Sequence, residues 1–291
     1  MAADSALAAA RNWPRQGAYL VTASRLASSL GRSATADSLL ATLNQMGYGW
    51  WTDHPSFASR QADPAFQELA SAARRNQAPL VRSTVFRELD DPGLHPEGVA
   101  IDPATGRVFV SSVRQQRVVE IAADGGVRDF LPNSVGLDAV LGLAVDSARR
   151  LLWVTTGEVP EQQREPLGLP GSTALLAVGL DDAAVTARWT IPDTTAAHLL
   201  GDVVMGRDGR AYATDSRLPG IYRTGTEAGG GVLERLPWWS DDWRSLQGLA
   251  FSGDGARAWV ADWTTGLYRI ATATGAVTPV GGAPSFYTLG V

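Results

Sequence analysis

The sequence contains no cysteine and no lysine. Without cysteine there is no disulfide framework, no thiolate nucleophile and no cysteine-ligated metal cluster. All 25 basic residues are arginines, which excludes a Schiff-base lysine and a P-loop lysine and is typical of a GC-rich bacterial genome. Histidine is scarce as well, with His54, His95 and His198 as the only three. A three-histidine zinc site would need all of them to converge, and we do not expect one.

Long apolar runs and a dominant positive charge are also missing. No stretch approaches the roughly 18 consecutive apolar residues of a membrane-spanning helix. The formal net charge is -5 and the arginines are scattered, so neither nucleic acid nor a membrane is an expected partner. The first residues lack the basic and apolar regions of a secretory signal. The composition indicates a soluble protein and leaves the cytoplasm, the periplasm and the exterior open.

Apolar residues at three-to-four spacing predict helices in the first 80 residues. One helix is expected over 18–30, and a second, capped by Ser33, ends at Gly47. A third begins at the N-cap Asp63, followed by a first-turn proline, and runs to about residue 75. The first two would form one antiparallel hairpin of tetratricopeptide type, and since such a unit cannot cover its own apolar faces, it should pack on a neighbour.

We therefore assign residues 1–80 to a tetratricopeptide-like helical segment and residues 81–291 to a second domain. A connection and an initial strand are expected within 76–96. From residue 97 the apolar period changes to two, which is typical of strands.

One phrase recurs four times in this second part. It opens as EGVAID at residue 97, LGLAVD at 141, GDVVM at 201 and QGLAF at 247, at intervals of 44, 60 and 46 residues. Each opening is followed by a turn and three further short strands, the fourth expected near Val127, Ala187, Val232 and Val277. Four short strands in about 40 to 50 residues make a β-propeller blade.

The second repeat carries an insertion at 158–171, rich in proline, glycine and charge, which indicates a surface loop at one mouth of the ring. The sequence stops partway into what would be a fifth inner strand. Because a ring must close to hide its edge strands, we expect a six-bladed ring truncated at the C-terminus. The predicted fold is mainly β, a propeller with four recognisable blades and a small N-terminal α-helical segment.

Residues 95–113, HPEGVAIDPATGRVFVSSV, resemble the senescence marker protein/gluconolactonase (luciferin-regenerating-enzyme-like) family of six-bladed propellers. Residues 209–216 and 247–252 resemble its later blades, and the likeness extends over about 94–291. It implies one divalent cation in the central channel, most often calcium, with zinc or manganese as alternatives, held by residues at the starts of inner strands. Glu97 occupies the matching place in the first blade. Leu141 and Gly201 stand at the matching places in the next two, which departs from the family pattern.

The candidate metal ligands are Glu97, Asp202 and Gln247, since the inner strands converge on the axis and hard cations prefer oxygen ligands. A solvated or arginine-paired carboxylate is the alternative for Glu97, and a structural amide is the alternative for Gln247. Asp202 begins an otherwise apolar strand, where a carboxylate needs hydrogen bonds or a cation. We also name Asp202 and His198 as candidate catalytic residues. His95 and His198 both precede inner strands and could serve as a base at the channel mouth, although a lone histidine is more often packed.

Two further groups have structural and functional interpretations. Asp215 and Asp262 end second strands, where they are expected to bind backbone amides between blades. Four tryptophans could line a ligand pocket or pack between blades; they are Trp238, Trp239, Trp243 and Trp263.

Two functions remain open. The first is a metal-dependent hydrolase of a lactone or related ester, with its small-molecule substrate in the central channel. The second is a non-catalytic scaffold that binds a small ligand through the ring or a protein through the helical segment.

Overall fold

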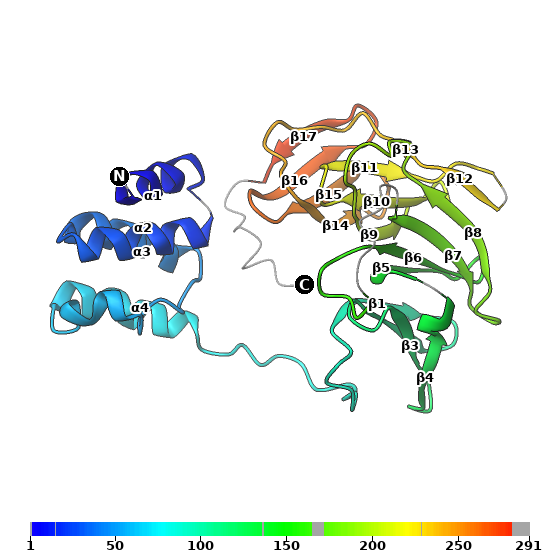
Figure 1. Ribbon diagram of the computed structural model, residues 1–291, viewed down its shortest axis with the longest axis horizontal. Helices are drawn as coiled ribbons and strands as arrows, with labels where there is room; N and C mark the ends of the chain where they lie inside the picture. Colours follow the sequence, from blue (N-terminus) through cyan, green and yellow to red (C-terminus); the bar gives the residue numbers. More distant parts are fainter. Residues whose placement is uncertain (1, 15, 136, 165–171, 228, 281–291) are drawn as a thin grey trace. The chain divides into compact units, whose positions relative to one another are not determined.

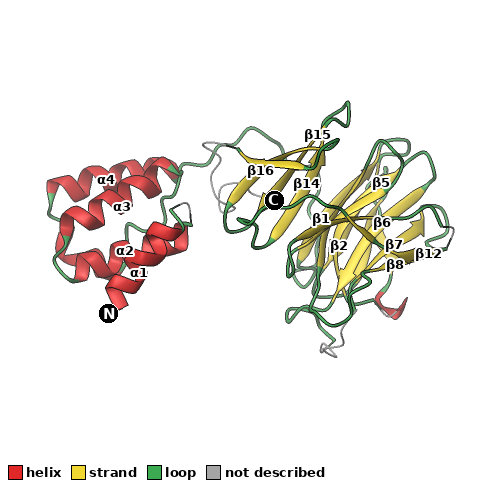
Figure 2. Ribbon diagram, turned by 90° about the horizontal axis from the view of Figure 1, so that it is seen from above, coloured by secondary structure: helices red, strands yellow, loops and turns green. Residues whose placement is uncertain are grey.

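The computed structural model describes residues 2–14, 16–135, 137–164, 172–227 and 229–280. The chain divides into two compact units. One holds the helices of the first 85 residues together with Trp263–Leu267, and the other comprises Phe86–Asp262 and Tyr268–Pro279. Figures 1 and 2 show the helices gathered in one unit and the sheets in the other. Within the described residues, no helix is long and apolar enough to cross a membrane.

The helical unit contains four α-helices and one short 3-10 helix among its described residues. They are α1 (Ala2–Asn12), α2 (Gly17–Ser29), α3 (Ser33–Gln45), η1 (Pro55–Arg60) and α4 (Pro64–Asn76). Successive α-helices pack against one another. The three predicted helices are present, whereas α1 and η1 were not predicted. Asp63 caps α4 as expected by accepting the amide of Ala65 at 3.0 Å. Ser33 is instead the first residue of α3, and the side chain of its N-cap Arg32 donates to Asp4 rather than capping the helix.

An aromatic cluster forms the centre of this unit. Trp51, Phe57 and Phe66 are almost fully buried, and Trp51 meets both phenylalanines edge-on at 5.8 and 5.7 Å between ring centroids. The buried guanidinium of Arg60 lies over the Phe66 ring and pairs with Asp37 at 2.6 Å. The unit thus has its own apolar core.

The described part of the sheet unit contains four sheets, each built on a four-stranded meander, and the second sheet has a fifth strand, β12 (Gly230–Val232). The first contains β1 (Pro96–Asp102), β2 (Arg107–Ser112), β3 (Arg117–Ile121) and β4 (Val127–Leu131), and the second contains β5 (Ala139–Asp146), β6 (Leu151–Gly157), β7 (Ala174–Gly179) and β8 (Val185–Thr190). The third contains β9 (Leu200–Met205), β10 (Ala211–Asp215), β11 (Gly220–Arg223) and β13 (Glu234–Arg235), and the fourth contains β14 (Leu246–Phe251), β15 (Arg257–Asp262), β16 (Gly266–Ala271) and β17 (Ala276–Pro279). A short 3-10 helix, η2 (Asn133–Val135), joins the first two.

The first strands of the four sheets lie side by side, β1 next to β5, β5 next to β9 and β9 next to β14. Each sheet then extends outward in chain order (Figure 1). This arrangement of successive meanders around their first strands is that of a β-propeller. The predicted fold class is therefore confirmed.

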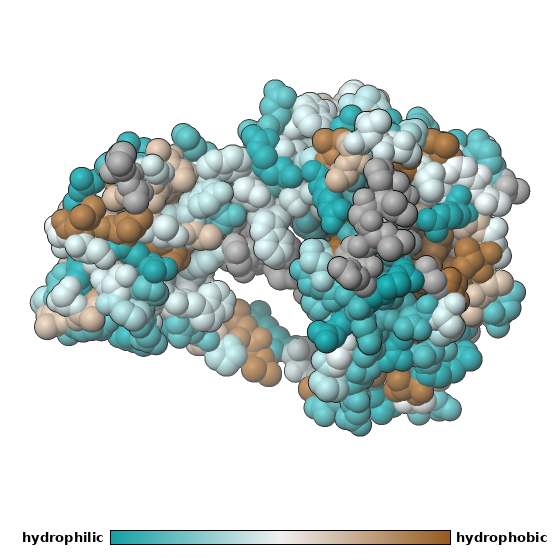
Figure 3. Space-filling model, in the orientation of Figure 1, coloured by the Kyte–Doolittle hydropathy of each residue, from teal (hydrophilic) through white to brown (hydrophobic). Residues whose placement is uncertain are grey.

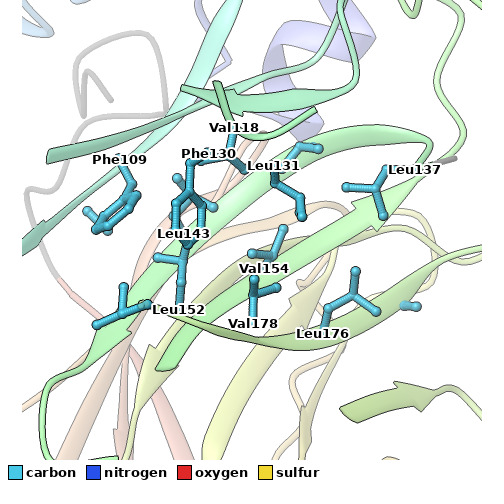
Figure 4. Close-up of a cluster of buried hydrophobic side chains, with 14 residues drawn as sticks. Phe109, Val118, Phe130, Leu131, Leu137, Leu143, Leu152, Val154, Leu176 and Val178 are labelled. Carbon is cyan, nitrogen blue, oxygen red and sulfur yellow. The ribbon is translucent and has the colours of Figure 1, made fainter. Parts of the chain in front are cut away.

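Apolar side chains fill the spaces between neighbouring blades. Figure 4 shows the cluster between the first two sheets, in which Phe109 and Phe130 of one sheet face Leu143, Leu152 and Leu176 of the other. Similar clusters join the second sheet to the third and the third to the fourth. Alternating apolar residues on both faces of each sheet are therefore what hold the blades together.

One predicted outer strand belongs to a different blade. Val232 lies in β12 (Gly230–Val232), which pairs in parallel with β8 of the second sheet, while β13 takes the fourth place in its own sheet. Gly229 and Gly230 have positive φ, and a Cβ at Gly230 would lie 1.8 Å from the carbonyl oxygen of Arg188. Glycine thus permits an approach to the second blade that the sequence period did not indicate.

The predicted initial strand within 76–96 does not form, and the first strand of the sheet unit begins at Pro96. Part of this connection covers the free face of the first sheet, where Leu89 and Leu94 pack on Val108, Val119 and neighbouring apolar residues. Other apolar residues are exposed, namely Leu80, Val81, Val85, Phe86, Val99 and Ile101. Figure 3 shows apolar surface as separate small areas among polar ones.

Candidate functional site

At the start of three inner strands, a side-chain hydroxyl from the second strand of the same blade accepts a backbone amide and so fixes the register. The amide of Gly98 donates to Ser111 Oγ at 2.7 Å, that of Gly142 to Thr155 Oγ1 at 2.7 Å, and that of Asp202 to Thr214 Oγ1 at 3.2 Å. The strand pairings give the same alignment. Asp202 therefore occupies the place that glycine holds in the first two blades.

The same hydroxyls also link neighbouring blades. Thr155 Oγ1 donates to the carbonyl of Gly201 in the third blade at 2.8 Å. Thr214 Oγ1 donates to the carbonyl of Gln247 in the fourth blade, also at 2.8 Å. Because both threonines are fully buried, each hydroxyl satisfies backbone groups that water does not reach. The inner strands are thereby held at fixed heights relative to one another.

Glycine is needed where a neighbouring inner strand passes closely. A Cβ at Gly98 would lie 2.4 Å from the carbonyl oxygen of Leu141, and one at Gly142 would lie 2.7 Å from the Cα of Asp202. The third blade differs, because the Asp202 carboxylate reaches across to the fourth and accepts the amide of Leu249 at 3.0 Å. The Asp202 side chain thus forms a hydrogen bond that joins blades three and four.

Asp202 also has an electrostatic effect across the ring. Burial raises the pKa of Asp202, and the amides of Leu249 and Val203 only partly oppose this. Glu97 is exposed, yet the protein around its carboxyl raises its pKa, and the negative charge of Asp202 raises it further. In the described part of the chain, no hydrogen bond or ion pair neutralises Glu97. Two carboxylates whose negative charges are only partly balanced therefore lie in one region at the starts of the inner strands.

Gln247 contributes to the same edge through its backbone and its amide. Its carbonyl accepts the Thr214 hydroxyl, and its side-chain Nε2 donates to Ser245 Oγ at 3.1 Å. The chemistry of the three residues, two carboxylates and an amide oxygen, fits a hard cation. Among the described residues, however, no group of three or more histidines, aspartates or glutamates is arranged to hold a metal ion. A cation at Glu97 and Asp202 would need amide, carbonyl or water oxygens to complete its shell.

His198 lies in a different environment from Glu97. It is buried, and its Nδ1 lies 2.5 Å from Asp215 Oδ2 while its ring meets Tyr222 edge-on. Its contacts are therefore with the second and third strands of its own sheet. His95 is exposed, with a left-handed backbone at φ 46 immediately before β1. The structure does not bring His198 to the edge where Glu97 and Asp202 lie.

The two aspartates at second-strand ends do bind backbone amides. Asp215 Oδ1 accepts the amides of Leu199, Arg217 and Leu218. Asp262 accepts the amides of Arg244 and Ser245 at 2.6 and 2.8 Å in the fourth blade. These bonds lie within one blade, whereas the sequence analysis expected bonds between blades. They hold the chain that leads into each inner strand.

Two of the four tryptophans belong to blade packing. Trp238 and Trp243 are buried in the core between the third and fourth sheets, where Trp238 stacks on Tyr212. Trp239 is half exposed, with the Arg235 guanidinium 5.5 Å from its ring centroid. Trp263 is 37% exposed. The packing interpretation therefore holds for Trp238 and Trp243.

Comparisons with known proteins show what the chain is similar to. A scan against models of protein families finds no match, and a search of curated proteins finds none. Among solved structures, a hydrazine synthase of Kuenenia stuttgartiensis is 17% identical, with a TM-score of 0.49 over 69% of this chain and 52% of the other. A chain of a nidogen/laminin complex is 18% identical, with a TM-score of 0.49 over 67% and 69%. The virginiamycin B lyase of Staphylococcus aureus is 13% identical, with a TM-score of 0.41 over 67% and 74%.

The chain thus spans about half of the hydrazine synthase chain. At these identities and TM-scores the likenesses carry no function to this protein. The class of protein is defined by its own sheets, which are β-propeller blades with an N-terminal helical unit. The resemblance to gluconolactonases stays a prediction.

These hydroxyl contacts were not predicted, although the sequence contains a pattern that indicates them. Ser111, Thr155 and Thr214 stand at the same place in the second strand of three repeats, and Ala261 stands there in the fourth. A buried hydroxyl recurring at a fixed offset indicates a repeated backbone contact.

Proposed function

We propose that the starts of the inner strands bind a divalent cation through Glu97 and Asp202, and that the protein is a metal-dependent hydrolase of a lactone or related ester. The observation that carries the proposal is the pair of inner-strand carboxylates whose pKa values are both raised. Bringing two such charges together is unfavourable, and a cation bound between them reverses the sign of that interaction. Calcium is the ion that an all-oxygen donor set fits best.

The residues have distinct parts in this proposal. Glu97 supplies the carboxylate with the fewest other bonds, while Asp202 divides its oxygens between the Leu249 amide and the cation. The amide oxygen of Gln247 is a third donor. When bound, the cation would polarise an ester carbonyl and lower the pKa of an attacking water. The gluconolactonase-like phrase at 95–113 supports this reaction class.

His198 has no catalytic part in this proposal, although the sequence analysis named it as a base. Its Nδ1 is committed to Asp215, and both side chains are buried. Of the two candidate catalytic residues, only Asp202 stays at the proposed site, where its carboxylate is a ligand of the cation.

A second candidate function is a non-catalytic scaffold. Leu141 places an apolar side chain where the second blade would supply a ligand, and one Asp202 oxygen already holds the Leu249 amide. The ring and the helical unit would then present surfaces to a small ligand or a protein.

Hydrolysis of a panel of lactones and aryl esters distinguishes the two candidates. The protein is stripped with a chelator, assayed, and assayed again after calcium, manganese or zinc is restored. The hydrolase proposal expects turnover that returns with the cation and falls at least about tenfold in Glu97→Gln, whereas Glu161→Gln, an exposed glutamate, is unchanged. If no substrate is hydrolysed with any of the ions, the scaffold is the better description.

A further inference from the structure

His198 is buried between two aspartates that lie on opposite sides of its ring. Nδ1 lies 2.5 Å from Asp215 Oδ2, and Nε2 lies 3.8 Å from Asp193 Oδ2. Only 1% of the His198 side chain is exposed, against 45% for Asp193. Nε2 is buried and has no hydrogen-bond partner among the described residues. A polar atom in such a place needs an explanation.

The protonation states of the ring can be worked out from these contacts. The Asp215 carboxylate only accepts, so Nδ1 must carry a proton. A neutral ring would then turn the Nε2 lone pair towards the Asp193 carboxylate, which also only accepts. Only the imidazolium, with a proton on each nitrogen, offers a donor to both aspartates. The geometry therefore favours a charged His198.

Asp193 is well placed to remain ionised. The amide and the hydroxyl of Thr195 both donate to its Oδ1, at 2.8 and 2.7 Å. These bonds, with a smaller contribution from the charge of His198, lower the pKa of Asp193. Other ionisable groups also surround the pair. Burial, followed by the charge of Asp215, raises the pKa of Tyr222, and Arg235 opposes this rise. The backbone amide of Arg217 donates to Asp215, while its guanidinium donates to the carbonyl of Glu158 at 2.8 Å.

The segment between the two partners leads directly into the strand that carries Asp202. The amide of Leu199 donates to Asp215 Oδ1 at 3.1 Å, and that of Leu200, the first residue of β9, donates to Thr173 Oγ1 at 2.9 Å. Ile191 is buried in the core between the second and third sheets, so the loop is fixed at both ends and Asp193 lies on its exposed part. The His198–Asp193 contact joins that exposed part to the buried end.

We propose that Asp193, His198 and Asp215 form a proton-dependent latch that closes the loop before β9. With His198 protonated, the ion pair to Asp193 holds the loop against the blade. Loss of the Nε2 proton removes the attraction, leaves a lone pair facing a carboxylate, and releases the loop. The latch does not depend on the cation or on any hydrolytic activity.

The experiment follows the ring protons of His198 and the amide hydrogen exchange of residues 194–198 against pH. Since the chain has three histidines, His54→Gln and His95→Gln assign the ring signals. The test variant is Asp193→Asn, because its amide oxygen can still accept from Thr195. The matched control is Asp254→Asn, whose Oδ1 accepts the Ala256 amide in a similar exposed turn with no histidine.

In wild type, the exchange of the loop amides is expected to rise in step with loss of the His198 ring proton as the pH is raised. Asp193→Asn is expected to raise loop exchange roughly two- to fivefold at the pH where the wild-type loop is protected, in line with the loss of a partly exposed ion pair. Asp254→Asn should leave it unchanged. The proposal is overturned if loop exchange does not follow the protonation of His198, or if the loop of Asp193→Asn exchanges like that of wild type.

Discussion

Removing the Thr155 hydroxyl should destabilise the ring far more than removing the one beside it. Thr155 Oγ1 accepts the Gly142 amide and donates to the Gly201 carbonyl of the next blade. Thr156 is equally buried, but within the part of the chain that the structure describes its Oγ1 has no hydrogen-bond partner. Thr155→Val and Thr156→Val replace the same atom with a methyl group at adjacent positions. Their difference isolates the hydroxyl link between blades.

The magnitude follows from the two backbone groups that Thr155→Val leaves unpaired. A buried donor without an acceptor costs about 1–3 kcal/mol, and the lost bond to the Gly201 carbonyl adds about 1 kcal/mol. We expect a loss of about 2–4 kcal/mol in the free energy of unfolding. For an m-value of about 2–3 kcal/mol per molar urea, the midpoint should fall by roughly 1 M.

Urea unfolding followed by tryptophan fluorescence and circular dichroism measures both variants. Thr156→Val should stay within about 0.5 kcal/mol of wild type or gain stability, because it removes an unpaired buried hydroxyl. Equal losses in the two variants would show that the hydroxyl contacts do not hold the blades, and that only side-chain volume matters.

Three further predictions concern stability and its dependence on pH, each measured by urea unfolding. Phe109→Ala should cost about 3–5 kcal/mol, since this buried ring packs edge-on against Phe130; a loss below about 1 kcal/mol would contradict the assigned core. Burial opposes ionisation of Asp102, yet hydrogen bonds from Arg150 and Thr105 lower its pKa, so Arg150→Met should destabilise the protein at neutral pH. That difference should shrink as the pH falls below about 4, where the unfolded carboxyl is protonated. Glu97 has a raised pKa, so the wild type should lose stability as the pH rises above about 4. At pH 7 in the presence of a chelator, Glu97→Gln should therefore be more stable than the wild type. Equal stabilities of the two proteins would contradict the raised pKa.

The blade structure could be predicted because several independent features of the sequence indicate it. The period-two apolar pattern, the glycine turns and the repeat length all indicate four-stranded blades. Val232 does lie in a strand, but the prediction of its blade was wrong, because the glycines before it permit a close approach to Arg188 of another blade. Such a long-range contact leaves no periodic signal in the sequence.

The site could be predicted only in part. Glu97 and Asp202 were recognised as carboxylates at inner-strand starts, and the structure places them within electrostatic reach. The partners of Asp202 and His198 could not be predicted, because the Leu249 amide and the Asp193 carboxylate depend on how blades and loops meet. Sequence spacing gives the strand on which a residue lies, but not which side chain from another loop faces it.

Thermal unfolding of the full chain, stripped of metal and then titrated with calcium, tests the central proposal most directly. At calcium about 100 times its dissociation constant, binding adds about 2.7 kcal/mol of stability, which should raise Tm by roughly 5–10 °C. Glu97→Gln should abolish the rise, and Glu161→Gln should retain it. A wild-type Tm that calcium, manganese and zinc all leave unchanged, or a rise that survives Glu97→Gln, would contradict a cation site at Glu97 and Asp202.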